Sequence, residues 1–172
     1  MAERADNEIT ALWGDRLAAV PAHRIPPGAD PATARFLTTV GLPTIRVQGI
    51  EFVHDERISR TVEHFGRHYL QCAEIDGTPI GIDLAGGQVA ALIGGRRART
   101  MFVNSGLLQF LLALGAWNRD VWEPTVVGMR AEDGFRAYDH FEATQRERDP
   151  AAFGNGCYWP ELLEGLREGA ER

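Results

Sequence analysis

Residues 68–95 read HYLQCAEIDGTPIGIDLAGGQVAALIGG, and this stretch decides the fold. It contains short apolar runs separated by turn-forming pairs: residues 68–75, 79–84 and 88–93, with Asp76-Gly77 and Gly86-Gly87 between them. Asp-Gly and Gly-Gly pairs favour tight turns between strands. Connections this short join antiparallel neighbours, because a parallel crossover needs about a dozen residues or more. The stretch therefore predicts an antiparallel β-meander.

Further strands and helices are predicted on both sides of this meander. The strands are residues 50–54 and 100–103, and the helices are residues 6–14, 30–41, 106–117, 135–148 and 160–167. Asp6, Asp30 and the pair Asn104-Ser105 precede helices and are expected to cap their free amides. The helix at 106–117 is apolar on almost every face, which predicts that it is buried across the sheet. The fold class is therefore α+β, with an antiparallel β-meander packed with helices in a single domain over residues 1–172.

Composition is that of an ordinary globular chain. It has 172 residues, of which 44% are hydrophobic and 24% charged. No apolar run approaches the roughly 18 to 20 residues that span a bilayer, and residues 1–8 lack the apolar stretch of a signal peptide. Cys72 and Cys157 form no CxxC motif and are expected to be structural thiols. These features predict a cytoplasmic protein without a membrane partner.

The charge of the chain restricts its partners. The formal net charge is −6, and all 18 strongly basic residues are arginine. The absence of lysine, together with abundant alanine and glycine, indicates a GC-rich genome, and we expect an actinobacterial source. A negative surface disfavours direct binding of nucleic acid and favours a basic protein partner, although solubility alone also explains it.

No pattern of catalytic residues emerges from the sequence. The serines, Ser59 and Ser105, lie outside any GxSxG motif, and a standard P-loop is excluded because there is no lysine. His64 and His68 have the i, i+4 spacing of helical metal ligands, but Gly66 weakens such a helix and His68 begins a predicted strand. The arginines of residues 96–99 are expected at a solvated hairpin tip. We therefore expect no enzyme, no cofactor and no metal.

Several segments, taken in order, resemble the SUKH superfamily, in particular its actinobacterial immunity branch. They are Ala34-Arg-Phe-Leu-Thr-Thr-Val-Gly-Leu-Pro43, Pro79-Ile-Gly-Ile-Asp-Leu84, Gly87-Gln-Val89 and Val103-Asn-Ser-Gly-Leu-Leu-Gln-Phe-Leu111. In that family a helix ending in a similar Gly-Leu-Pro precedes a β-meander, and an Asn-Ser segment then opens the helix packed on the sheet. This chain departs from the pattern at Gly106, where the family has a second serine.

The resemblance implies an α+β fold and a role as an immunity protein. Such proteins bind and block a cognate polymorphic toxin, often a nuclease or a deaminase, and they offer no catalytic residues to transfer. Their toxin-binding residues vary with the partner. An alternative from another class is a non-catalytic scaffold or regulatory module, and a third is an enzyme whose residues meet only in the folded chain.

A toxin that attacks nucleic acid has a basic substrate groove, so an acidic surface would speed its capture through long-range attraction. We therefore expect the partner-binding residues in a less regular region and on the helix that follows it. They are Trp122, Glu123, Glu132, Asp133, Asp139 and Glu142. Two alternatives remain: Trp122 packs at the edge of the core, and Glu132-Asp133 form a solvated turn before Gly134.

Overall fold

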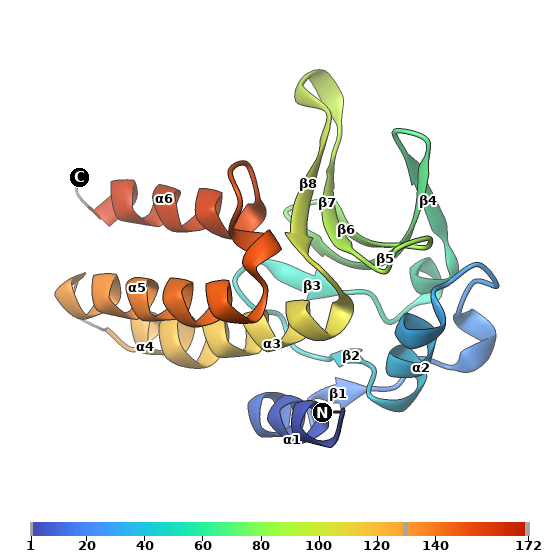
Figure 1. The fold of residues 1–172 in the computed structure, drawn as a ribbon, viewed down its shortest axis with the longest axis horizontal. Coiled ribbons are helices and arrows are strands. Elements are labelled where there is room, and N and C mark those ends of the chain that lie inside the picture. Colours follow the sequence, from blue (N-terminus) through green and yellow to red (C-terminus); the bar gives the residue numbers. More distant parts are fainter. Residues whose placement is uncertain (1, 129–130, 171–172) are drawn as a thin grey trace.

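An antiparallel sheet lies beside a layer of helices in the computed structural model, which describes residues 2–128 and 131–170 (Figure 1). The side chains described are those of residues 7–128 and 133–169. The six strands of the sheet are β3 (Ile50–Phe52), β4 (Thr61–His64), β5 (Arg67–Ile75), β6 (Thr78–Asp83), β7 (Val89–Ile93) and β8 (Arg99–Asn104). Every pairing is antiparallel, so the predicted α+β fold with its β-meander is confirmed.

The strand order is β3-β5-β6-β7-β8, and β4 pairs with β5 as well. The long strand β5 serves two partners, because its first half pairs with β4 and its second half with β3. Strand β4 was not predicted, although Thr61-Val-Glu-His64 alternates in its burial as a strand with one covered face does. Because residues 61–64 form a strand, His64 and His68 do not lie on one helix, as the predicted spacing of metal ligands would require.

Both cysteines are buried thiols. Cys72 lies on β5 at a bulge between Gln71 and Ala73, where the register with β6 shifts by one residue. Burial raises the pKa of the Cys72 thiol to about 12, so it stays protonated and unreactive at neutral pH. Cys157 is buried as well and is a free thiol.

Helices precede and follow the sheet. They are α1 (Ala2–Trp13), α2 (Pro31–Thr39), α3 (Leu107–Trp117), α4 (Glu123–Val126), α5 (Ala131–Arg148) and α6 (Tyr158–Ala170). The prediction that Asp6 caps the first helix is wrong, because the good helix formers before it extend α1 back to Ala2. Similarly, α6 begins before Pro160, which fits its first turn because amides there have no partner within the helix.

Helix α2 begins and ends as predicted. The Asp30 carboxylate accepts a hydrogen bond of 2.9 Å from the Thr33 amide, and Pro31 occupies the first helical position. Leu37 is fully buried, whereas Phe36 and Val40 are only partly covered. After the helix, Gly41 has a φ of +91° and turns the chain into β2 (Leu42–Pro43), which pairs with β1 (Leu17–Ala18). This small second sheet lies next to α1, which packs below α3 (Figure 1).

The start of α3 differs from the prediction, because neither Asn104 nor Ser105 caps it. Gly106 is the residue before the helix, and no side chain bonds its first amides. The Asp149 carboxylate instead accepts hydrogen bonds from Asn104 Nδ2 (2.9 Å), from the Ser105 amide (2.8 Å) and from Ser105 Oγ (2.6 Å). The charged Asp149 carboxylate is a strong acceptor for these donors, and it holds both residues in place at the end of β8. The Asn-Ser segment thus fastens β8 to the end of α5.

Aromatic side chains fill the space between α3, α5 and α6. Trp117 stacks on Tyr138 with their ring centres 6.1 Å apart and meets Phe141 edge to face at 5.0 Å. Trp159 packs against both Trp117 and Phe141, and its Nε1 donates a hydrogen bond to Asn104 Oδ1 at 3.0 Å. Because α3 also covers the sheet with Phe110 and Leu111, one continuous core joins the helices to the sheet.

Candidate functional site

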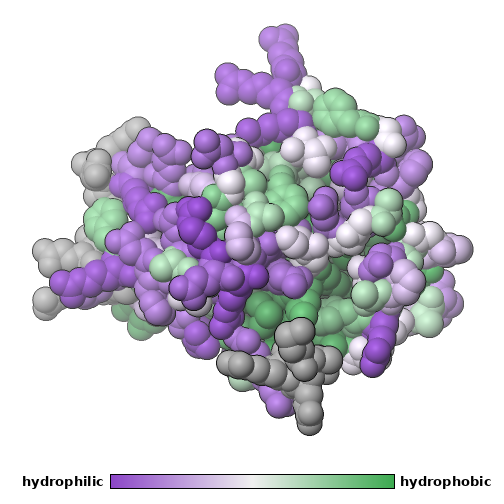
Figure 2. Space-filling view, in the orientation of Figure 1, coloured by the Kyte–Doolittle hydropathy of each residue, from purple (hydrophilic) through white to green (hydrophobic). Residues whose placement is uncertain are grey.

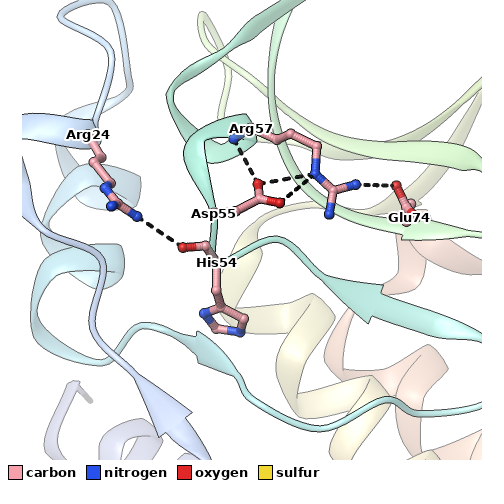
Figure 3. A network of polar contacts seen from close by, with 5 residues as sticks. All are labelled: Arg24, His54, Asp55, Arg57 and Glu74. Atoms are coloured by element: carbon pink, nitrogen blue, oxygen red, sulfur yellow. Dashed lines mark hydrogen bonds and ion pairs between the residues drawn. The ribbon is translucent and has the colours of Figure 1, made fainter.

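A network of polar contacts occupies the corner between β3 and the short 3-10 helix Glu56–Ser59 (Figure 3). The Asp55 carboxylate accepts hydrogen bonds from the Arg57 amide (2.8 Å) and from Arg57 Nε (3.0 Å to Oδ2). Arg57 Nη1 donates to Glu74 Oε2 on β5 at 2.9 Å, and Arg24 Nη1 donates to the carbonyl oxygen of His54 at 3.0 Å. The network therefore ties this corner to β5 and to the turn that precedes α2.

The charges of this network stabilise one another. The backbone hydrogen bond from Arg57 lowers the pKa of Asp55, and the side-chain hydrogen bond to Asp55 raises the pKa of Arg57. Both residues consequently stay ionised across the neutral range. His54 Nε2 lies 2.7 Å from the carbonyl oxygen of Pro43 and donates to it. Each of these groups is engaged in holding the corner together.

A shallow cavity of about 460 Å³ lies next to this corner. It is lined by Arg46, Glu51, Phe52 and Thr44, together with residues of the polar network. No serine or cysteine lines it, so the cavity contains charges and an aromatic ring but no activated nucleophile. Across the described residues, no group of three or more His, Cys, Asp or Glu could hold a metal ion. Nor is any helix among them long and apolar enough to cross a membrane.

The structure places Trp122 and Glu123 in a helical segment and not in an irregular one. Trp122 ends a π-helical turn, Asn118–Trp122, that extends α3, and Glu123 begins α4. The Trp122 side chain is 37% exposed, and Val126 and Val127 beside it are 67% and 85% exposed. Glu123 Oε1 accepts a hydrogen bond of 2.8 Å from Asn118 Nδ2. This segment presents an exposed apolar surface next to a carboxylate.

The other predicted residues lie on α5. Asp133 lies exposed in the first helical turn of α5. The alternative of a solvated, non-helical turn before Gly134 is therefore wrong. The side chain of Glu132 lies outside the described residues. Arg167 of α6 reaches both Asp139 Oδ1 (2.8 Å) and Glu142 Oε2 (3.0 Å). Arg146 adds a second bond to Glu142, and this bond is the main reason why the pKa of Glu142 is lowered.

The contacts divide the predicted residues between two sides of the helical layer. Asp139 and Glu142 lie on the side of α5 that faces α6. Glu123 points the other way, 3.9 Å from Arg16, which follows α1. The arginines beside them also balance part of the acidic charge. The sequence could not show this separation, because it depends on which helix packs on each face of α5.

The hairpin that joins β4 to β5 is a feature that sequence reasoning missed. Its tip carries Phe65, whose side chain is 66% exposed, the largest aromatic exposure among the described side chains. The alternating residues 61–64 followed by Gly66 are the signal that could have predicted this turn. Instead, the i, i+4 spacing of His64 and His68 is a pattern typical of a helix.

The chain matches the model of one protein family, described as SUKH-4 immunity protein, over residues 5–165. No curated protein and no solved structure matches it. The match covers most of α1, the whole sheet and most of α6, and so includes both layers of the fold. This is a family of non-catalytic immunity proteins. The chain therefore belongs to the SUKH-4 immunity protein family.

Proposed function

We propose that this chain neutralises a cognate toxin, a nuclease or a deaminase, by binding to it in the cytoplasm of an actinobacterium. Membership of an immunity protein family is the observation that carries the proposal. The net charge of −6 supports a toxin with a basic substrate groove, because opposite charges accelerate association. The chain acts by covering the toxin and contributes no chemistry of its own.

The exposed face of the helical layer is the first surface at which we place this contact. Trp122 supplies a partly exposed aromatic side chain, and aromatic residues are favoured at the centres of interfaces. Glu123, which follows Trp122 in the chain, and Asp133 on α5 supply exposed carboxylates. Asp139 and Glu142 lie on the side of α5 that faces α6, so the proposed set spans two sides of the layer, and Glu132 completes it by sequence.

Co-expression with the polymorphic toxin encoded beside this chain tests the proposal. We expect cell growth to be rescued and a stable one-to-one complex to be purified with both proteins present. The control is an unrelated immunity protein, which should leave the toxin active. Continued killing by the toxin, with no complex formed by a well-folded chain, would reject toxin neutralisation and favour a scaffold role.

Charge reversal tests the acidic surface separately. We expect Glu132→Lys with Asp133→Lys to slow association with the toxin by about tenfold at low salt, with a smaller effect at high salt. The control is Glu51→Lys with Glu56→Lys, which makes the same change in net charge at exposed positions on β3 and in the following turn. Equal affinity and equal salt dependence in the two variants would remove the acidic surface from the interface.

A further inference from the structure

The turn between β4 and β5 contains a residue that its backbone geometry disfavours. His64 pairs with Arg67, so Phe65 and Gly66 form a two-residue turn, and their φ angles are +49° and +73°. Positive φ at both positions is the type I′ geometry, which favours Asn-Gly or Asp-Gly. The next hairpin of the same sheet follows that rule, because Asp76-Gly77 has φ angles of +47° and +79°. Phe65 occupies the position that Asp76 occupies there.

Phe65 does not serve the core either. Its side chain is 66% exposed and packs edge to face on His64, with the ring centres 4.6 Å apart. A bulky side chain in the left-handed region is strained, and an exposed phenyl ring gains little from folding. Neither the turn geometry nor packing in the core explains why a phenylalanine occupies this position. A role as an exposed aromatic anchor at an interface does explain it.

A second hairpin, which carries positive charge, meets the hairpin that carries Phe65. His64 Nε2 lies 3.2 Å from the carbonyl oxygen of Arg99, which brings the end of β4 against the start of β8. The β7–β8 connection also carries Arg96 and Arg97, both exposed, in the turn just before Arg99. Figure 2 shows strongly hydrophilic side chains projecting where this hairpin ends, with an apolar patch next to them. We call the surface formed by His64, Phe65, Arg96 and Arg97 the hairpin pole.

The charge of the hairpin pole is free to act on a partner. Arg67 is paired with Asp83 at 3.0 Å and Arg99 with Glu161 at 2.6 Å. Arg96 and Arg97, by contrast, have no ion pair with any carboxylate that the structure describes. Residues 61–68 and 94–99 together hold four arginines and one acidic residue, in a chain with a net charge of −6. Positive charge is thus concentrated at the hairpin tips of an acidic molecule.

We propose that the hairpin pole is a docking surface for an acidic face of the toxin, and that Phe65 inserts into an apolar pocket there. The proposal rests on the proposed function, since the toxin is the partner, and it adds a second contact outside the helical layer. The free arginines complement acidic groups, and the ring supplies the buried centre that an interface needs. A protein fits better than nucleic acid, because the net negative charge of the chain repels a polyanion at long range.

Replacing Phe65 tests the anchor. Phe65→Asn removes the ring and installs a residue that favours positive φ, so the hairpin should fold with an equal or higher thermal midpoint. We expect the dissociation constant of the purified toxin complex to rise about tenfold or more, mainly through faster dissociation. Phe65→Tyr, which keeps the ring, should bind the toxin about as tightly as the wild type. Wild-type affinity in Phe65→Asn would overturn the proposal.

Charge reversal tests the sign of the partner surface. We expect Arg96→Glu with Arg97→Glu to slow association with the toxin about tenfold at low salt. The control, Arg35→Glu with Arg46→Glu, makes the same change in net charge at exposed arginines away from the hairpins, on α2 and before β3. Faster association of the Arg96 and Arg97 variant than of this control would mean that the facing surface is basic, and would overturn the proposal.

Three outcomes separate this inference from the proposed function. If the wild-type chain neither protects cells nor forms a complex, the toxin-binding function itself fails, and the inference fails with it. If the wild-type chain protects and the variants at the hairpin pole bind as tightly as it does, only the inference is overturned. If toxin binding is unchanged but Arg96→Glu with Arg97→Glu abolishes retardation of a short RNA or DNA duplex, the occupant is nucleic acid, which also overturns it.

Discussion

Asp149 is a buried carboxylate on which three parts of the chain depend. It is 5% exposed and accepts hydrogen bonds from Asn104 and Ser105, and Asn104 in turn accepts one from Trp159. These contacts join β8, the loop before α3, the end of α5 and the start of α6. The residues that carry the family resemblance at 104–105 therefore hold the sheet and the helices together.

We expect Asp149→Ala to lower the free energy of unfolding by about 3 kcal/mol, because it leaves buried donors of Asn104 and Ser105 without an acceptor. Asp149→Asn should cost less, since its amide oxygen can still accept one of these bonds. Urea unfolding, with an unchanged dependence on denaturant concentration, measures both effects. The control is Glu147→Ala at an exposed position of α5, and an equal loss there would contradict this role for Asp149.

Glu142 gives the stability of the helical layer a defined pH dependence. Hydrogen bonds from Arg146 and Arg167 lower its pKa below the usual value for a glutamate. The stability that it contributes is thus complete above the pKa of the unfolded chain and is lost as the pH falls through the lower pKa of the folded chain. We expect the wild type to lose more stability than Glu142→Gln between about pH 5 and pH 3, by less than about 1 kcal/mol because solvent screens the pair. Parallel unfolding curves for the two proteins across that range would contradict the assignment.

At the scale of the element, the end of α2 is fixed by close backbone contact. Gly41 has a φ of +91°, and a Cβ atom placed on it would lie 1.9 Å from the carbonyl oxygen of Ala18. The β1–β2 pairing can form only because glycine leaves this space open. The sequence predicted a glycine stop for the helix, but the contact with β1 follows from the tertiary structure.

We expect Gly41→Ala to destabilise the protein by more than about 2 kcal/mol, because both the backbone conformation and the β1 contact must change. The control is Gly165→Ala in α6, where a Cβ would meet nothing within 4 Å. That substitution should raise stability by up to about 1 kcal/mol through better helix propensity. Thermal unfolding measures both, and a loss of similar size at the two glycines would contradict the explanation.

The strands show which elements the local sequence pattern predicts and which it does not. Five of the strands were predicted from apolar runs and glycine turns, because side-chain period and turn chemistry are local properties. Strand β4 was missed because Thr61-Val-Glu-His64 is short and polar, and its pairing with β5 supplies most of its stability. The caps at Asn104 and Ser105 failed for a related reason, since their partner Asp149 is distant in sequence.

At the scale of the whole molecule, two surfaces of different character project from one core. The helical layer carries Trp122 with carboxylates, and the β4–β5 and β7–β8 hairpins carry Phe65 and two arginines that have no ion pair among the described residues. The net charge alone describes neither surface, because charges of both signs are segregated along the fold.

Binding to the native state should raise the apparent stability of the whole molecule. We expect the thermal midpoint to increase with the concentration of inactivated toxin, by an amount equivalent to about 2.7 kcal/mol at 100 times the dissociation constant. A fluorescence or calorimetric melt of the complex measures it, with an unrelated basic protein as the control for charge alone. Equal shifts with the two proteins, or none with the toxin, would contradict specific binding.

The sequence by itself determined the α+β class, the main strands, most of the helices and the family resemblance, because periodicity, turn residues and capping are encoded locally. Only the tertiary structure decided that Asp139 and Glu142 pair with Arg167, that Glu123 lies near Arg16, and that the end of β4 meets the start of β8. Those relations join residues far apart in the chain. They depend on how the helices pack and how the hairpins bend, which no local pattern specifies.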